Sequence, residues 1–366
     1  MAAVRASIAR PGELGGPELD AWRAMQAALP ELGNAFLAPA FARAVDRVRA
    51  DVRVGVLSDG ADLVGFLPFH RGPMRRGRAL GTGFVDRQAL VAGGPLGPLG
   101  ITPPDVIRAC GLDVWEFDHL VAAERWPLGA PGAHRLASPV MDLAAGFGAY
   151  LDGRRTVAGG TIASVLRKRR KLQREHGPVQ VVVGADDHGA LALLERWKSA
   201  QYRRTARRDR FAQPWLAALV DDLFSTDEPG CCGMLSLLLA GDRPVAGVFG
   251  LYGDGTLSSW FPAYDPAYAA YSPGMVLFLG LAEAAAGAGI DRIDLGKGDE
   301  AYKAVLADAS VEVAEGTVER RSASAMALRL QRLPRRALTG LVLGHPTLRL
   351  AAHRSLERIG RMHHGG

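Results

Sequence analysis

Residues 256–303 read TLSSWFPAYDPAYAAYSPGMVLFLGLAEAAAGAGIDRIDLGKGDEAYK, and this stretch decides the fold. Its first eight residues are rich in β-branched and aromatic side chains, which favour a strand, and Asp265-Pro266 and Ser272-Pro273-Gly274 predict turns. Residues 275–288 carry a single charge, Glu283, which predicts a helix buried nearly all round. Residues 290–295 alternate apolar with charged side chains, a pattern typical of a second strand with one buried face.

This predicted strand, glycine turn, helix and strand form a unit suited to an anion. The free amides of the first helical turn point the same way as the positive end of the helix dipole, and together they favour a phosphate. An ordinary crossover between parallel strands, without a ligand, has the same local pattern. The local sequence therefore leaves both interpretations open.

The length and composition predict a soluble protein of two domains. A chain of 366 residues is too long for one comfortable core, and 48% hydrophobic with 22% charged residues is typical of globular proteins. The first residues lack an apolar signal core, and no apolar run reaches about 18 residues. We therefore expect a cytoplasmic protein, and its three cysteines fit a reducing compartment without structural disulfides.

Positive charge is concentrated in three parts of the chain. The net charge is +6, and basic clusters occupy residues 154–174, 203–210 and 329–361. Such clusters attract nucleic acid, an anionic membrane surface or a phosphate-rich cofactor, and they also occur as solvated surface. The tail over 326–366 predicts interrupted helices that either pack on the domain or lie peripherally on a membrane.

The two halves of the chain show a weak internal duplication. Residues 52–69 and 234–251 each predict a hairpin, with matching glycines at Gly60 and Gly241. We place an N-terminal domain at 1–150, a second domain at 151–325 and a basic helical tail at 326–366. Residues 129–139 are expected to form a loop, and residues 161–176 a basic helix along the domain junction.

Familiar catalytic and metal-binding motifs are missing. The chain has no HExxH, GxSxG or CxxC pattern and no Walker loop, and Gly296-x-Gly298 alone is too weak to predict a dinucleotide site. The nine histidines show no spacing typical of metal ligands, so we expect no metal.

The second half resembles GNAT-type acyltransferases of the CelD/BcsL group, which is associated with cellulose biosynthesis, and more distantly the Fem-type aminoacyltransferases. The similarity extends over about 155 residues, and Gly65-Phe66-Leu67-Pro68 extends it to the first half. It rests on residues 164–177, 197–205, 242–246, 263–268, 271–274, 294–296 and 300–303.

The resemblance implies an α/β fold of tandem GNAT-like domains, each a mixed, mostly antiparallel sheet flanked by helices. It also implies acetyl-CoA or another acyl-CoA as donor. Family members bind its pyrophosphate on a glycine turn that opens a helix. Here that turn contains Pro273, which has no amide to donate. The cofactor-binding residues are then Ser272, Gly274, Met275 and Val276, with Lys303 holding a phosphate or carboxylate.

The implied reaction is direct attack on the thioester by an amine, or alternatively a hydroxyl, of a small molecule, amino acid or sugar. Such a reaction needs a base and an acid. Asp299 and Glu300 are the candidate bases, and Tyr302 and Tyr271, with Tyr268 as a further option, are the candidate acids. The candidate substrate-binding residues are Trp197, Gln201, Tyr202, Tyr264 and Tyr268.

Two other functions fit the same sequence. In a Fem-type enzyme the donor would be an aminoacyl-tRNA, whose backbone the basic clusters would bind. In a non-catalytic partner of an envelope or polysaccharide pathway, the tail would serve as a tether. Steep salt dependence of tRNA binding distinguishes the first, and membrane binding that requires the tail distinguishes the second.

Overall fold

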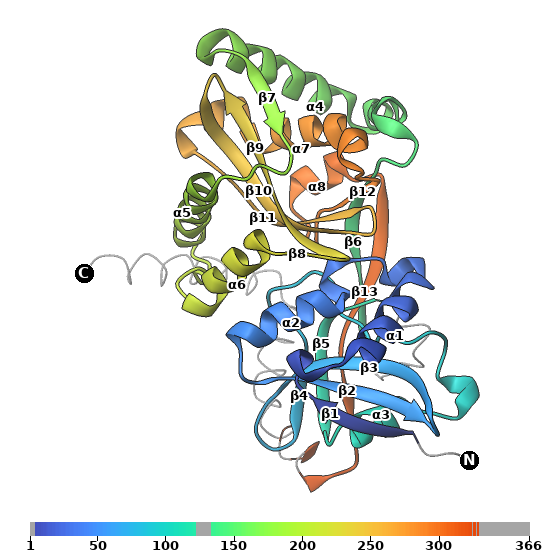
Figure 1. Ribbon diagram of the computed structural model, residues 1–366. Coiled ribbons are helices and arrows are strands. Elements are labelled where there is room, and N and C mark those ends of the chain that lie inside the picture. Colours follow the sequence, from blue (N-terminus) through green and yellow to red (C-terminus); the bar gives the residue numbers. More distant parts are fainter. Residues whose placement is uncertain (1–3, 122–132, 324, 327, 329–366) are drawn as a thin grey trace, which may run out of the picture.

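The computed structural model describes residues 4–121, 133–323, 325, 326 and 328. Within these residues a single 13-stranded sheet runs through two halves of the molecule (Figure 1). The first half contains β1 (Arg5–Ala9), α1 (Gly16–Ala27), α2 (Pro39–Val48), β2 (Val52–Asp59), β3 (Asp62–Arg71), β4 (Arg76–Ala79), α3 (Pro103–Ala109), β5 (Val114–Leu120) and β6 (His134–Asp142).

The second half begins with the long helix α4. It contains α4 (Gly146–His176), β7 (Val179–Val182), α5 (His188–Arg204), α6 (Pro214–Ser225), β8 (Asp227–Glu228), β9 (Cys231–Ala240), β10 (Arg243–Gly253), β11 (Thr256–Tyr264), α7 (Pro273–Ala284), β12 (Arg292–Asp294), α8 (Ala301–Leu306) and β13 (Ala309–Glu319).

The strand order is β1-β2-β3-β4-β5-β13-β6-β12-β11-β10-β9-β7. The pattern of strand pairing met from the β1 end is nearly the same as the pattern met from the β7 end. The β2–β3 and β9–β10 pairs are antiparallel hairpins, whereas β4 with β5 and β11 with β12 are parallel. Both hairpins turn at a left-handed glycine, Gly60 at φ 61° and Gly241 at φ 58°. The predicted hairpins and the tandem arrangement of two similar halves are confirmed.

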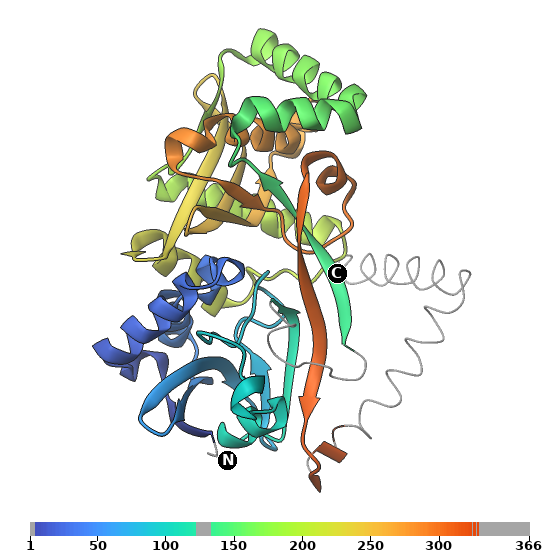
Figure 2. The ribbon, with the colours of Figure 1, turned by 90° about the vertical axis from the view of Figure 1, so that its right-hand side faces the viewer.

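β6 and β13 interlock the two halves. β6 follows β5 in the chain but pairs with β12, and β13 follows β12 but pairs with β5 (Figure 2). A boundary at residue 150 stays a prediction, because the final strand of each half completes the sheet of the other. The loop expected over 129–139 is wrong from His134 onward. The first four residues of β6 are all exposed, so they lack the alternation that marks a strand, and Pro139 is unusual within one.

The decisive stretch folds as predicted. β11 is followed by a short 3-10 helix, Pro266–Tyr271, then by α7 and β12. α7 buries eight of its twelve residues, and Gly280 brings it against β7, since a Cβ there would lie 2.5 Å from Val181 Cγ2. A second 3-10 helix, Ala285–Ala288, ends at Gly289, whose φ is 68°.

The basic helix α4 lies away from the domain junction, contrary to expectation. Ile162, Val165 and Leu172 pack into the same core cluster as Leu277 and Leu281 of α7. α4 therefore covers the far end of the second half, opposite the first half (Figure 2). Its apolar stripe matches the apolar face of α7, and this packing decides its place rather than its position in the sequence.

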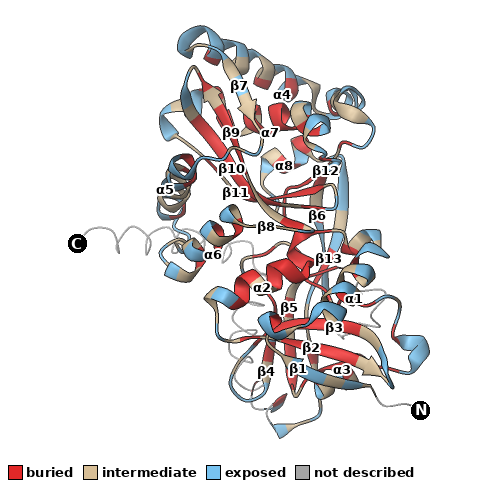
Figure 3. Ribbon diagram, in the orientation of Figure 1, coloured by how far each residue is buried: buried red, intermediate tan, exposed pale blue. Residues whose placement is uncertain are grey.

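A shared core joins the two halves. Phe36 and Phe41 stack edge-on against Trp260 of β11 at 5.3 and 6.3 Å between ring centroids. Asn34 Nδ2 donates to Ser258 Oγ at 2.9 Å, and most residues of α2 are buried (Figure 3). The residues on the two sides of this junction are therefore held together by packing and by a hydrogen bond.

Among the described residues, no helix combines the length and apolar character needed to cross a membrane. The tail predicted over 326–366 lies outside the described residues, except for Met326 and Leu328.

Candidate functional site

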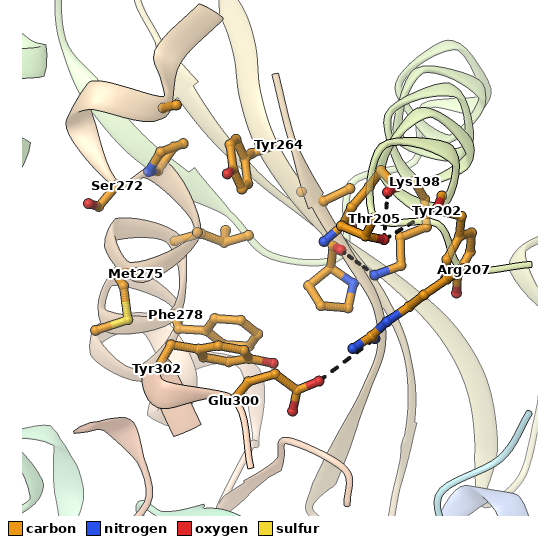
Figure 4. Close-up of a pocket in the computed structure, with 18 residues that line it drawn as sticks. Lys198, Tyr202, Thr205, Arg207, Tyr264, Ser272, Met275, Phe278, Glu300 and Tyr302 are labelled. Carbon is orange, nitrogen blue, oxygen red and sulfur yellow. Dashed lines mark hydrogen bonds and ion pairs between the residues drawn. The ribbon is translucent and has the colours of Figure 1, made fainter. Parts of the chain in front are cut away.

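The strands β11 and β12 diverge beside the site. They pair only over Thr256–Ser258 and Arg292–Asp294, after which β11 continues to Tyr264 while β12 has ended. The edge of β11 that faced β12 therefore has no partner strand over residues 259–264 among the described residues. A cavity of about 420 Å³ lies along this part of the strand, between α5 and the first turn of α7 (Figure 4). We call it the helix cavity.

The first turn of α7 forms one end of the helix cavity. Ser272, Gly274 and Met275 line it, as expected for cofactor-binding residues. The amides of Met275 and Val276 donate to the carbonyl of Ser272 at 3.0 and 3.1 Å, so they are already bonded within the helix. Val276 itself is buried in the core and does not line the cavity, which corrects its assignment. Because Pro273 has no N–H, Gly274 offers the amide that helix geometry leaves without an acceptor.

Ser272 links α7 to the basic helix α4. Ser272 has left-handed backbone angles, φ 51° and ψ 54°, which are uncommon for a residue with a side chain. Its Oγ accepts a hydrogen bond from Lys168 Nζ at 2.7 Å. An ammonium group and the positive end of a helix dipole therefore meet at one point on the cavity rim, where both favour an anion.

Of the five candidate tyrosines, three lie at the site: Tyr202 on α5, Tyr264 and Tyr302. Tyr264 lines the helix cavity, and Tyr302 stacks on Phe278 at 6.0 Å (Figure 4). Burial, with the charge of Glu300, raises the pKa of Tyr302 well above its usual value. Its phenol therefore stays protonated and able to donate.

Tyr268 and Tyr271 lie elsewhere, which corrects their proposed roles. The 3-10 helix that holds them turns their rings toward the end of α4. Tyr271 donates to Glu175 Oε2 at 2.5 Å, and Tyr268 packs edge-on against His176 at 5.0 Å. Neither lines a cavity described here.

Of the two candidate bases only Glu300 lies at the site. Asp299 is exposed and lines neither the helix cavity nor the second cavity described below. Glu300 forms ion pairs with Lys303 at 3.0 Å and Arg207 at 3.9 Å. Burial raises the pKa of Glu300, but the hydrogen bond and charge of Lys303 outweigh it, so the net pKa is lowered. A carboxylate held in its charged form is a weaker base.

Lys303 is buried and is not part of the first turn of α7. Its Nζ donates to the carbonyls of Gly296 and Lys297 at 3.0 and 3.1 Å. Lys303 therefore holds the loop after β12 and lines the second cavity, which corrects its assignment to the cofactor phosphate.

The last turns of α5 form the opposite wall of the helix cavity. Gln201 and Tyr202 line it, and Gln201 Oε1 has no hydrogen-bond partner among the described residues. Trp197, the third candidate on this helix, packs against the core and lines neither cavity. Lys198, which the sequence analysis left out of its site, lines both cavities, and the spacing of 198, 201, 202 and 205 on one helical face was the available signal.

Lys198 stands where the two cavities meet. Its Nζ donates to the carbonyl of Pro262 at 2.9 Å. Burial lowers the pKa of Lys198 to about 8, and the charges of Arg210 and Arg207 contribute. This ammonium is therefore desolvated, and it is placed to stabilise negative charge at the junction.

A second cavity, of about 750 Å³, lies between the halves, and we call it the interdomain cavity. Residues of the first half, including Arg78, Phe84 and Asp86, form one side of it. Lys198, Tyr202, Arg207, Pro262, Glu300 and Tyr302 line both cavities, which are therefore adjacent.

Asp86 is a carboxylate that the sequence analysis did not single out. It is half-buried against Gly296, whose φ is 73°, and a Cβ at Gly296 would lie 2.9 Å from the Asp86 carboxylate. Burial and the charge of Asp294 raise the pKa of Asp86 to about 6. Asp294 is itself paired with the buried Arg87 at 2.6 Å. No local pattern marks Asp86, because its surroundings come from the far end of the chain.

Comparison with known proteins agrees with this architecture. Residues 160–304 match the family model described as an acetyltransferase (GNAT) domain. FemX has a TM-score of 0.55 at 9% identity, covering 83% of this chain and 96% of its own. The C-terminal domain of a putative lysylphosphatidylglycerol synthetase from Agrobacterium fabrum has a TM-score of 0.53 at 14% identity, covering 85% and 96%.

A conserved protein of unknown function from Bacteroides thetaiotaomicron has a TM-score of 0.52 at 12% identity, covering 82% of this chain and 97% of its own. No curated protein matches the chain in sequence. At these identities the structural likeness concerns the fold alone. Residues 160–304, which contain the whole lining of the helix cavity, thus match a GNAT acetyltransferase domain, and the chain as a whole has the fold of FemX.

Proposed function

We propose that this protein is an N-acyltransferase that moves an acyl group from acyl-CoA to an amine of a small molecule. The observation that carries the proposal is the opening that β11 and β12 leave between them where they diverge, beyond Ser258 and Asp294. It opens beside the first turn of α7, within the region that matches the GNAT model, and leads into a second cavity large enough for an acceptor.

The donor fits the helix cavity. The amide of Gly274 and the ammonium of Lys168 supply positive charge for a pyrophosphate at the start of α7. Beyond Ser258 the edge of β11 that faced β12 has no partner strand among the described residues, so an extended chain containing amide groups has room to lie beside it, although Pro262 has no N–H and its carbonyl already accepts from Lys198. The thioester would then lie near Lys198, where the cavities meet.

The reaction needs one base, one acid and one donor to the oxyanion. The base removes a proton from the ammonium group of the acceptor, and the free amine attacks the thioester carbonyl carbon. A C–N bond forms, the C–S bond breaks, and the sulfur leaves with the electron pair. Lys198 stabilises the negative oxygen, Tyr302 gives its proton to the thiolate, and the second proton lost by the attacking nitrogen restores the Tyr302 phenol.

Asp86 is better suited than Glu300 to be the base. Its pKa of about 6 lies close to neutral pH, where a base is both deprotonated and strong enough to act. The charge of Asp86 also raises the pKa values of Tyr202 and Tyr302, which line the junction, so the three side chains are electrostatic neighbours.

The donor site proposed here is in the second half, and the corresponding place in the first half is closed. α3 occupies the place in the first half that α7 occupies in the second. Its N-terminus is closed by Asp105, whose carboxylate accepts from the amide and hydroxyl of Thr102. The carboxylate of Asp105 already occupies the positive end of the α3 dipole, and its negative charge would repel a phosphate there.

Calorimetric titration with acetyl-CoA and desulfo-CoA at two salt concentrations tests the proposal. Saturable binding is expected, and Gly274→Asp is expected to weaken it at least about tenfold by placing a carboxylate in the first turn of α7. Gly287→Asp is the matched control, because Gly287 has nothing within 4 Å of an added Cβ and lies in the 3-10 helix that follows α7, away from its first turn. Binding that both variants leave unchanged would contradict the proposed donor site.

An aminoacyl-tRNA donor, as in Fem-type enzymes, is the second candidate. The fold shared with FemX and the exposed Arg203, Arg204, Arg207 and Arg208 beside the cavities favour it. It predicts that tRNA binds with steep salt dependence while acetyl-CoA does not bind at all.

A further inference from the structure

The interdomain cavity carries a large excess of positive charge. Seven cationic side chains line it against two carboxylates, Asp86 and Glu300. The cationic residues are Arg49, Arg78, Lys198, Arg207, Arg208, Arg210 and Lys303. Some are paired, as Lys303 is with Glu300 at 3.0 Å. Like charges in one concave site repel one another, so an excess of this kind stabilises a bound anion.

Three of these arginines have no carboxylate partner among the described residues. Arg78 lies on β4 of the first half, and Arg208 and Arg210 lie in the segment between α5 and α6. Arg78 is distant in sequence from Arg208 and Arg210, and the fold brings the three to the lining of one cavity. The charge of Arg210 also lowers the pKa of Lys198, so positive potential extends to the junction with the helix cavity.

The same cavity has an aromatic wall and an unsatisfied hydroxyl. Phe84 packs edge-on against Trp215 at 5.0 Å and lies 6.3 Å from Trp260. Ser259 is only 4% exposed, and its Oγ has no hydrogen-bond partner among the described residues. A buried polar group without a partner is costly, and a polar group of a ligand in this cavity would satisfy it.

We propose that the interdomain cavity is the acceptor site, and that the acceptor carries an anionic group, a carboxylate or a phosphate, in addition to its amine. Arg78, Arg208 and Arg210 bind the anionic group, while the amine lies at the junction beside Lys198. The donor site proposed above, at Lys168 and the start of α7, lies outside this cavity, so these arginines remain available to the acceptor. This inference rests on the proposed acyl transfer for the identity of the ligand as acceptor.

A binding experiment tests the site without acyl transfer. Phenyl phosphate, phenylacetate and the neutral benzyl alcohol are titrated into the full-length protein by calorimetry. The two anions are expected to bind and the alcohol is not. Arg78→Gln and Arg208→Gln should each weaken the anions about tenfold, the usual effect of losing a hydrogen bond to a charged group. Arg204→Gln removes the same charge from an exposed position outside both cavities and should change nothing.

An acceptor experiment then tests the substrate class, with acetyl-CoA as donor and release of free thiol as readout. Glucosamine 6-phosphate is compared with glucosamine, and phenylalanine with phenylalaninamide, so that the two pairs separate phosphate from carboxylate recognition. At least a tenfold preference for one anionic member in kcat/KM is expected. Arg78→Gln should abolish that preference through KM, with kcat retained, and Arg78→Lys should restore part of it.

Three results would overturn the proposal. They are equal turnover of the anionic and neutral members, a loss of acetyl-CoA affinity in the arginine variants, and displacement of the anionic probes by tRNA at low concentration. Failure of acetyl-CoA to bind would instead contradict the proposed function, because the titrations with phenyl phosphate and phenylacetate do not depend on it. An unchanged affinity for acetyl-CoA also shows that each variant is folded.

Discussion

Asp86 is a carboxylate whose surroundings oppose its charge. Asp294 and burial favour its protonated form, whereas His119, Arg87 and Lys303 favour the ionised form, and the balance raises the pKa of Asp86 to about 6. Since a base acts when deprotonated, kcat/KM should fall about tenfold per pH unit below this value. Asp86→Asn should remove most of the activity together with this acid limb of the pH profile. Glu300→Gln should retain the limb, and a limb that survives in Asp86→Asn would exclude Asp86 as the base.

The same variant should be more stable than the native protein at neutral pH. The pKa of Asp86 is raised in the folded state, so the folded protein binds this proton more tightly than the unfolded chain does. Its contribution to stability is complete below pH about 4 and is lost as the pH rises through about 6. Asp86→Asn should therefore raise the free energy of unfolding at pH 7, by up to about 3 kcal/mol, with little effect at pH 4. Urea unfolding at the two pH values measures this difference.

At the scale of elements, Ser272 is the cap residue between the 3-10 helix and α7, and it combines a strained backbone conformation with a place in the proposed donor site. Ser272 adopts left-handed angles, and its Oγ accepts from Lys168 at 2.7 Å. Ser272→Gly should relieve about 1 kcal/mol of strain, because glycine adopts these angles freely. It should also weaken acetyl-CoA binding several-fold, because Lys168 loses the partner that positions it.

Asp254→Gly is the matched control for that cap. Asp254 is exposed in the turn between β10 and β11, and its φ of 49° is close to that of Ser272. The substitution should raise stability by a similar amount and leave acetyl-CoA affinity unchanged, as measured by thermal unfolding and calorimetry. If both variants keep full affinity, the cap has a structural role alone.

At the scale of the whole molecule, the exchange of β6 and β13 and the shared aromatic core couple the two halves. Phe41 is fully buried and contacts Phe36 and Trp260 across the junction. Phe41→Ala should cost about 3 to 5 kcal/mol. Hydrogen exchange should then lose protection in β3 and β10 together, because the halves unfold as one unit. A loss confined to β3 would show that the halves unfold independently.

Much of the fold could be predicted from the sequence where local pattern and tertiary environment agree. The helix α7 has apolar residues on every side, and such a segment has no stable place other than the interior. The hairpins turn at Gly60 and Gly241, which tolerate positive φ. β6 was missed because its first four residues are exposed, so it has no apolar alternation and pairs through backbone hydrogen bonds.

The candidate site divides in the same way. Ser272, Gly274 and Gln201 could be found because each belongs to a local unit, a helix start or one helical face, whose geometry follows from spacing. Tyr268 and Tyr271 are close in sequence to that unit but face α4 instead, because the 3-10 helix rotates them away. Sequence proximity predicts the element that a residue occupies, but the direction of its side chain depends on packing.

The sequence by itself determined the βαβ unit around α7, the two hairpins and the tandem arrangement, because backbone propensity, apolar periodicity and glycine turns act over a few residues. Only the tertiary structure decided the chemistry of the cavities. The pKa of Asp86, the base in the proposed reaction, is raised because burial and the charge of Asp294, more than half the chain away, oppose its ionisation. Arg78 and Arg208, which would bind the anion in the proposed acceptor site, line one cavity because the two halves share a core, and electrostatic interactions depend on distance in space rather than along the chain.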